Sequence, residues 1–200
     1  MNSAPLPRRL LAEFLGSALL AAAVIGSGVA AQRLSPHDTG LELFENAAAT
    51  AAGLYAIILK FGAVSGGHFN PAVSIADAVF GGLGRRELLA YLPAQVAGCA
   101  LGAILANAMF ALAAVSISAK GRASPAHLLS QTIATFGLLL VIFALARTRR
   151  IGSAPAAVGA SVPGFVLAQL VGTALAVVAI RTLYPRTQPA DAASVVVPHR

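Results

Sequence analysis

The sequence predicts an all-α membrane protein, a bundle of apolar helices arranged as an inverted repeat whose second half is shortened. Three observations support this fold class. Hydrophobic residues make up 58% of the 200 residues and charged residues only 10%, whereas soluble domains contain roughly 25% charged residues. Several apolar runs are long enough to cross a bilayer. Similar segments recur in the two halves of the chain, as they do in many membrane transport folds.

The membrane spans are predicted from the apolar runs, taken in order. They cover Leu10–Ala31, Leu43–Val64, Leu88–Phe110 and Ala126–Ala146, and a last apolar stretch extends from Ile151 to Ile180. The first run follows two arginines, as a signal peptide would, but it exceeds the roughly 7–15 apolar residues of a signal core. We therefore expect it to be a membrane span.

Basic residues lie in short clusters between the apolar runs, which is typical of cytoplasmic loops. The loops after the second and fourth spans contain Arg85, Arg86, Arg147, Arg149 and Arg150. This bias predicts a cytoplasmic N-terminus. The net charge of +7 is therefore explained by membrane orientation, and we expect the lipid bilayer as a partner and no nucleic acid.

The segment Ser65-Gly66-Gly67-His68-Phe69-Asn70-Pro71-Ala72-Val73-Ser74 is the most informative part of the chain. Asn70 suits a helix N-cap, and Pro71 suits the first helical position, where no N–H is needed. The helix that follows ends at Gly81-Gly82, so it is too short to cross a bilayer. Such a half-helix is tolerated at membrane depth only where it is buried in protein or lines a water-filled cavity.

This segment resembles the major intrinsic protein family, the aquaporins and glycerol facilitators, in which SGxHxNPAVS recurs almost verbatim. The resemblance implies an aquaporin-like inverted repeat in which two half-helices meet at the bilayer centre. It also implies a homotetramer and the passage of water, glycerol or other small neutral solutes. The residues that it assigns to the pore are Asn70, Pro71 and Ala72, together with the loop carbonyls of Gly66, Gly67 and His68.

An internal repeat shows what the second half lacks. The segment around Glu13 matches that around Gln131, and the segment around Gln95 matches that around Gln169. Glu13 and Gln95 are 82 positions apart, whereas Gln131 and Gln169 are 38 apart, so the second half is 44 residues shorter. Most of a fifth span and the second half-helix are thus missing. The alternative is that Ser-Ala-Pro-Ala-Ala at 153–157 is a degraded second motif, which offers neither Asn nor Arg.

Three further residues are candidates for supporting or lining the site. In the family, the residue at Glu13 accepts hydrogen bonds from the half-helix loop; alternatively, Glu13 pairs with the arginines that precede it. Gln131 is its counterpart in the second repeat. Thr50 lies 20 positions before Asn70, the family position of the narrow selectivity ring, or it is a small residue at a helix contact.

Other site chemistry finds little support in the sequence. We recognise no nucleophile–base arrangement, phosphate-binding loop or paired carboxylates, so we expect no enzyme. No cysteine, aspartate or second histidine lies at ligand spacing from His68, so we expect no metal and no cofactor.

The expected protein is one membrane domain over 1–200, with a first repeat over about 8–119 and a second over about 126–185. We expect an aquaporin-like channel in a bacterial inner membrane that conducts poorly because the second half-pore is missing. The alternatives are a non-conducting truncated relative and a membrane scaffold or partner protein.

The last apolar stretch is long enough for one crossing and too short for two. We expect a single crossing from the cytoplasm outward, with a helix over about Val162–Thr182 extended at its start by Ala154–Ser161.

Overall fold

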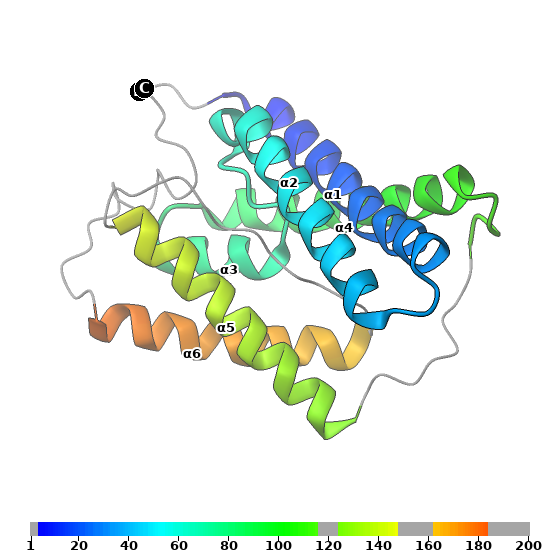
Figure 1. Ribbon diagram of the computed structural model, residues 1–200. Coiled ribbons are helices and arrows are strands. Elements are labelled where there is room, and N and C mark those ends of the chain that lie inside the picture. Colours follow the sequence, from blue (N-terminus) through cyan, green and yellow to red (C-terminus); the bar gives the residue numbers. More distant parts are fainter. Residues whose placement is uncertain (1–3, 116–123, 148–161, 184–200) are drawn as a thin grey trace.

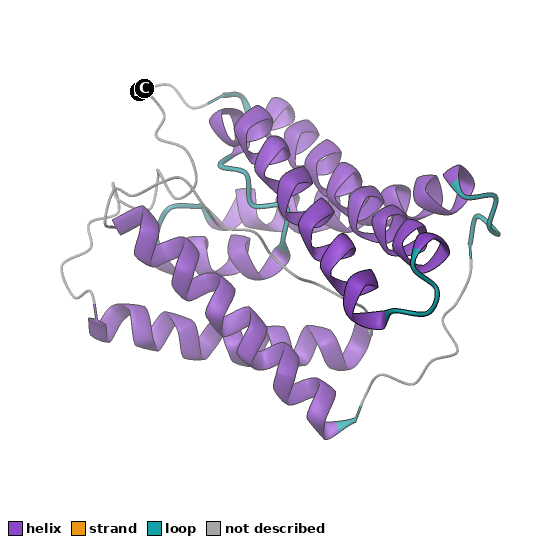
Figure 2. Cartoon of the chain, in the orientation of Figure 1, coloured by secondary structure: helices purple, strands orange, loops and turns teal. Residues whose placement is uncertain are grey.

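The computed structural model describes residues 4–115, 124–147 and 162–183, with the backbone alone at 144–147 and 162–170. All the regular elements in these ranges are α-helices (Figure 2). They are α1 (Leu6–Leu34), α2 (Thr39–Ser65), α3 (Pro71–Phe80), α4 (Arg85–Met109), α5 (Pro125–Arg147) and α6 (Val162–Leu183). Within the described part, α1, α2, α4 and α5 are long and apolar enough to cross a membrane. The all-helical membrane fold predicted from composition is confirmed.

Local sequence explains where the helices begin. The first begins at Leu6, one turn before the apolar run, because Pro7 suits the first turn of a helix. Asp38 caps α2 by accepting a hydrogen bond from the Leu41 N–H at 2.9 Å. Asn70 caps α3 in the same way, as the next subsection describes. The predicted spans therefore lie where expected, and α1, α2 and α4 each begin three or four residues before the apolar run.

The helices form two groups joined by the short helix. Helix α1 packs against both α2 and α4, α5 packs against α6, and α3 contacts α4, α5 and α6. Figure 1 shows α3 between the α1–α2–α4 group and the α5–α6 pair. Among the described helices, α2 has α1 as its one helix neighbour. The half-helix is therefore the element through which the second half of the chain is attached to the first.

The two groups share one kind of close helix contact. A Cβ placed on Gly98 of α4 would lie 2.3 Å from the carbonyl oxygen of Phe14 on α1. A Cβ on Gly172 of α6 would lie 2.6 Å from the carbonyl oxygen of Thr132 on α5. These two pairs are at equivalent positions of the sequence repeat, and small residues are what membrane helices use to approach closely.

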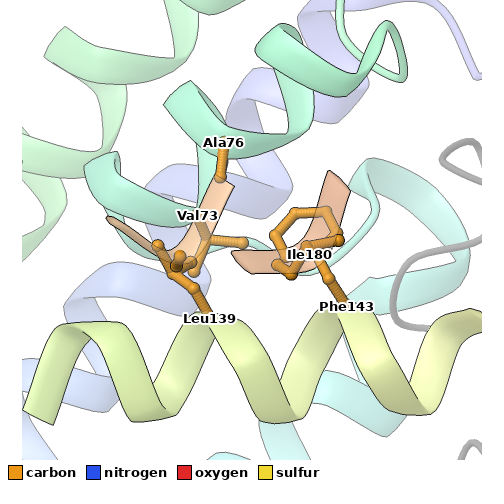
Figure 3. Close-up of a cluster of buried hydrophobic side chains, with 6 residues drawn as sticks. Val73, Ala76, Leu139, Phe143 and Ile180 are labelled. Carbon is orange, nitrogen blue, oxygen red and sulfur yellow. The ribbon is translucent and has the colours of Figure 1, made fainter. Parts of the chain in front are cut away.

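The direction of α6 corrects one expectation. Thr132 packs near Gly172, and further along both helices Leu139 and Phe143 pack with Ala176 and Ile180 (Figure 3). Contacts that advance together along two helices mean that α5 and α6 run in the same direction. The predicted outward crossing of the last stretch, opposite to α5, is therefore wrong. The prediction rested on length alone, whereas the close contact of Gly172 with the Thr132 backbone sets how α6 packs on α5.

The predicted extent of the last helix is confirmed, because α6 covers Val162–Leu183. The expected extension over 154–161 and the degraded-motif segment 153–157 lie outside the described residues.

An apolar cluster fixes the α5–α6 pair to α3. Its buried members are Val73, Ala76, Leu139, Phe143, Ala176 and Ile180. In Figure 3 the side chains from α3, α5 and α6 point toward one another. Beyond the cluster, Arg181 Nη2 donates to the carbonyl oxygen of Val79 at 3.3 Å, which satisfies one of the free carbonyls at the end of α3. One side of the half-helix is thus covered by apolar packing.

Candidate functional site

The loop that leads from α2 to α3 turns sharply. Gly66 and Gly67 have φ of 93° and 69°, values that glycine adopts without steric cost. Phe69 also has a positive φ, 49°, which is uncommon for an aromatic residue and is found where surrounding contacts fix the backbone. Its ring packs with Leu54 and Ile57 of α2. The turn therefore depends on both glycine and tertiary packing.

Asn70 ends the loop and starts the half-helix. Its Oδ1 accepts a hydrogen bond from the Ala72 N–H at 2.8 Å, and Pro71 occupies the first turn. The helix ends at Phe80, with Gly81 in the left-handed conformation as its C-cap. The half-helix predicted between Asn70 and the glycine pair is confirmed. Because Oδ1 is engaged, the Nδ2 amide is the part of the Asn70 side chain that remains available to donate.

Glu13 supports this loop from α1. Its side chain is fully buried. Its carboxylate accepts hydrogen bonds from the backbone N–H groups of His68 at 3.1 Å and Phe69 at 2.8 Å. It also accepts from Ser65 Oγ at 2.6 Å and from Gln95 Nε2 at 2.7 Å. Four donors from three segments therefore converge on one carboxylate, and this compensates for its burial.

Arg9, which precedes Glu13 by one helical turn, has other partners. Arg9 Nη1 forms an ion pair with Glu87 of α4, and Arg9 Nε donates to the Tyr91 hydroxyl at 2.9 Å. Tyr91 is fully buried and donates in turn to the Ser65 carbonyl oxygen at 2.8 Å. The alternative in which Glu13 pairs with a preceding arginine is therefore wrong. The cationic group instead supports the loop through Tyr91.

A second set of buried polar groups connects α3 to α4. Gln95 Nε2 donates to Ser74 Oγ at 2.8 Å as well as to Glu13. Ser74 Oγ lies 3.0 Å from His68 Nδ1, and His68 Nε2 lies 3.5 Å from Asp77 Oδ2. Sequence reasoning missed both Asp77 and the contacts of Gln95 with Glu13 and Ser74. The available signal was the spacing of Ser74 and Asp77, which puts both on one face of a short helix.

The fold encloses this chain of serine, histidine and aspartate side chains. Ser74 is fully buried, and His68 and Asp77 are nearly so. Among the described residues, no group of three His, Cys, Asp or Glu side chains could hold a metal ion.

The remaining predicted residues lie away from this network. Thr50 is buried on the face of α2 that also contains Leu54 and Ile57, and its Oγ1 has no hydrogen-bond partner in the described part. Because α1 is the one helix neighbour of α2 among the described helices, this placement suits a helix contact, and a role in selectivity stays a prediction. Gln131 lies on α5, whose described helix neighbours are α3 and α6, so it is not brought to the loop of Glu13.

The arrangement presents two features to a small polar solute. One is the Asn70 amide, a hydrogen-bond donor held at a fixed position by its cap contact. The other is the N-terminus of α3, where the peptide dipoles place partial positive charge. Both suit neutral molecules with hydroxyl or water oxygens, and both disfavour cations.

Comparisons with known proteins identify the family of the chain. The family model described as "Major intrinsic protein" matches residues 1–186. An aquaglyceroporin, AqpS of Rhizobium meliloti, is 46% identical over 75% of this chain and 64% of its own length. A probable aquaporin, AqpM of Archaeoglobus fulgidus, is 31% identical over 80% of this chain and 75% of its own length. A glycerol uptake facilitator protein of Streptococcus pneumoniae is 33% identical over 68% of this chain and 63% of its own length.

The chain therefore spans slightly less than two thirds of the length of two of these three relatives. The family model nevertheless matches nearly all of the chain, and its match includes the Asn70 half-helix and the segments that support it. The chain belongs to the major intrinsic protein family.

Proposed function

We propose that this membrane protein provides a path for water, glycerol or similar small neutral solutes, with Asn70 as its central hydrogen-bond donor. The observation that supports this most directly is the fixed geometry of Asn70. Its Oδ1 is held by the Ala72 N–H, and its loop is held by the buried Glu13. A solute oxygen then meets an amide that is already oriented. The names of the relatives, an aquaglyceroporin and a glycerol uptake facilitator protein, point to the same class of solute.

The loop supplies acceptors to complement that donor. The proposed mechanism uses the carbonyl oxygens of Gly66, Gly67 and His68 as successive acceptors along one wall. A solute that loses water at the entrance regains hydrogen bonds from these carbonyls and from Asn70. A cation gains less, because the N-terminus of α3 opposes it electrostatically.

We further propose that the chain conducts poorly when it acts alone. Asn-Pro-Ala occurs once in the sequence, so Asn70 has no second asparagine opposite it. Helix α2 contacts neither α5 nor α6 in the described part, which leaves the wall opposite the loop incomplete. This observation favours the alternative function, a non-conducting family member that serves as a scaffold or partner in the membrane.

The test is stopped-flow shrinkage of vesicles that contain the purified protein, first in an impermeant osmolyte and then with glycerol. The expected result is a weak flux that Asn70→Ala abolishes and that Asn107→Ala leaves intact, because the Asn107 amide donates to the Ala114 carbonyl oxygen at the far end of α4 and not to the loop before α3. Rapid selective flux like that of a full-length relative would reject poor conduction. Flux unchanged by Asn70→Ala would reject the channel role of Asn70.

The proposed location is a bacterial inner membrane, with the N-terminus in the cytoplasm and a homotetrameric assembly. The basic loops support the orientation. The contact of Arg181 with Val79 places the end of α6 on the side where α3 ends. A reporter fused to the C-terminus should therefore be active in the cytoplasm, and a silent reporter would contradict this topology. Native mass spectrometry checks the assembly, and a monomer would contradict it.

A further inference from the structure

Asp77 is a buried acidic residue whose role is not explained by the proposed solute path. Its Oδ2 lies 3.5 Å from His68 Nε2, and its Oδ1 has no hydrogen-bond partner in the described part. Room for the carboxyl group exists because residue 82 is glycine: a Cβ there would lie 2.3 Å from Oδ1. A carboxyl group at this depth is costly unless it has a partner. The partner that the structure offers is the His68 ring.

The hydrogen bonds from Glu13 to His68 form one chain, and donors can be assigned along it starting from the Gln95 amide. An ionised Glu13 only accepts, so it is the amide nitrogen of Gln95 that faces it. Gln95 Nε2 uses one hydrogen for Glu13 and the other for Ser74 Oγ. Ser74 Oγ therefore accepts from Gln95, and its own hydrogen is available to donate to His68 Nδ1, which lies 3.0 Å away.

This direction determines the state of the histidine ring. If Nδ1 accepts a hydrogen bond from Ser74, it carries no proton, and the proton of a neutral ring is on Nε2. The Nε2–H group then donates toward Asp77 Oδ2. In this arrangement each donor of the chain faces an acceptor, and the last contact, to Asp77 Oδ2, is the longest at 3.5 Å. Asp77 is the residue that terminates it.

We propose that Asp77 is a positioning residue of the Asn70 site, which holds His68 as the Nε2–H tautomer and thereby holds the loop in place. His68 is two residues before Asn70, and its backbone N–H donates to Glu13. Its ring and its backbone are thus fixed from opposite ends of one hydrogen-bond chain. A role in solute passage rests on the proposed function, whereas the tautomer and the stability of the loop do not.

Nitrogen-15 spectra of histidine-labelled protein in lipid nanodiscs test the tautomer directly, with His68→Gln identifying the signal of His68. The expected wild-type spectrum has an unprotonated Nδ1 and a protonated Nε2. Asp77→Leu keeps a similar volume and removes the acceptor, so the Nε2–H tautomer should be lost. A wild-type ring protonated on Nδ1, or a ring unaffected by Asp77→Leu, would overturn the proposal.

Amide hydrogen exchange tests the consequence for the loop. In Asp77→Leu the amides of His68 and Phe69 should exchange about tenfold faster, the effect of one lost buried hydrogen bond. Asp77→Asn retains a side-chain oxygen and should restore slow exchange. Exchange that is equal in the wild type and in the Leu variant would contradict a positioning role.

Gly82→Ala provides a milder variant in case Asp77→Leu does not fold. The new methyl group displaces the carboxyl group without changing its charge. It should raise exchange at His68 in the same direction but by a smaller factor. Gly137→Ala is the matched control, because a Cβ at Gly137 meets nothing within 4 Å. Equal effects of the two alanine variants would also overturn the proposal.

These measurements are independent of solute flux. If vesicle experiments show no conduction while the spectra show the Nε2–H tautomer, the proposed function fails and the positioning role stands. If flux depends on Asn70 while Asp77→Leu leaves the tautomer of His68 unchanged, the positioning role fails and the proposed function stands.

Discussion

The first half of the chain, α1 to α4, and the α5–α6 pair share a helix contact but differ in what surrounds it. In the first half, α1 and α4 meet at Gly98 and also contribute Glu13 and Gln95 to the loop. In the second half, α5 and α6 meet at Gly172 in the same way. The segment from Gln131 to Gln169 is 44 residues shorter than the matching segment from Glu13 to Gln95.

This difference shows that a helix contact and a polar site have different requirements. A close helix contact needs a small residue and a facing backbone, so it persists in a shortened repeat. A site needs buried polar groups from segments far apart in the chain, and each group must find its partner. In the structure, α3 uses the α5–α6 pair as an apolar cover, while its polar side chain Ser74 has partners from the first half in the described part, Gln95 and His68. We expect mutations to distinguish these two roles.

The largest expected effect is that of Glu13→Leu. The change leaves two backbone N–H groups and two side-chain donors without their acceptor. A cost of roughly 3–5 kcal/mol in the free energy of unfolding is expected for such a loss. Thermal unfolding in detergent measures it. The control is Glu42→Leu in the first turn of α2, and equal effects of the two changes would contradict the role of Glu13.

The next largest effect on stability is expected at the glycines of the two helix contacts. Gly98→Val and Gly172→Val each place side-chain atoms against the backbone of the facing helix, and each should cost about 1–3 kcal/mol by overpacking. Gly98→Val should also disturb the loop, because α4 supplies Gln95 and Tyr91. Faster amide exchange at Phe69 would show that disturbance. Gly137→Val is the control, and a loop disturbed as much by Gly172→Val would remove the distinction between the halves.

Much of this architecture could be predicted from local sequence. The spans follow from apolar runs, and the half-helix follows from Asn70, Pro71 and the glycine pair. Their signals are contained in a few neighbouring residues. The direction of α6 could not be predicted, because a length argument competed with a packing contact at Gly172. The contact is seen only in the structure, which places the Thr132 backbone against Gly172.

The site was predicted only where the family motif covers it. Asn70 and Glu13 were identified, and their contacts are as local chemistry and the resemblance imply. Asp77 was missed because its partner, His68, lies in a loop whose shape depends on positive φ values at three residues. The spacing of Ser74 and Asp77 puts both on one face of α3, but it does not show that the turn brings the His68 ring to that face. Polar networks that depend on it have to be read from the structure.

A smaller effect is expected for Tyr91→Phe. The hydroxyl group links Arg9 Nε to the Ser65 carbonyl oxygen, at 2.9 and 2.8 Å. Its removal should lower the free energy of unfolding by about 1–2 kcal/mol, because a buried carbonyl loses its donor. Tyr55→Phe, on an exposed ring, is the matched control. If both variants unfold at the same midpoint as the wild type, Tyr91 does not contribute to holding the loop.

The smallest effect on stability is expected for Arg181→Gln, because Arg181 is exposed and water can replace its hydrogen bond to the Val79 carbonyl oxygen. Position 181 is nevertheless informative, because the residues near it report the direction of α6. In a Cys99→Ala background, a short cross-linker in native membranes should join Val79→Cys to Arg181→Cys, since α6 runs parallel to α5 and ends beside α3. Arg33 contacts the Phe110 carbonyl at the far end of α4. Arg33→Cys should therefore not cross-link to Val79→Cys. Cross-linking of 79 to 33 but not to 181 would mean that the second half does not pack on the half-helix as the structure shows.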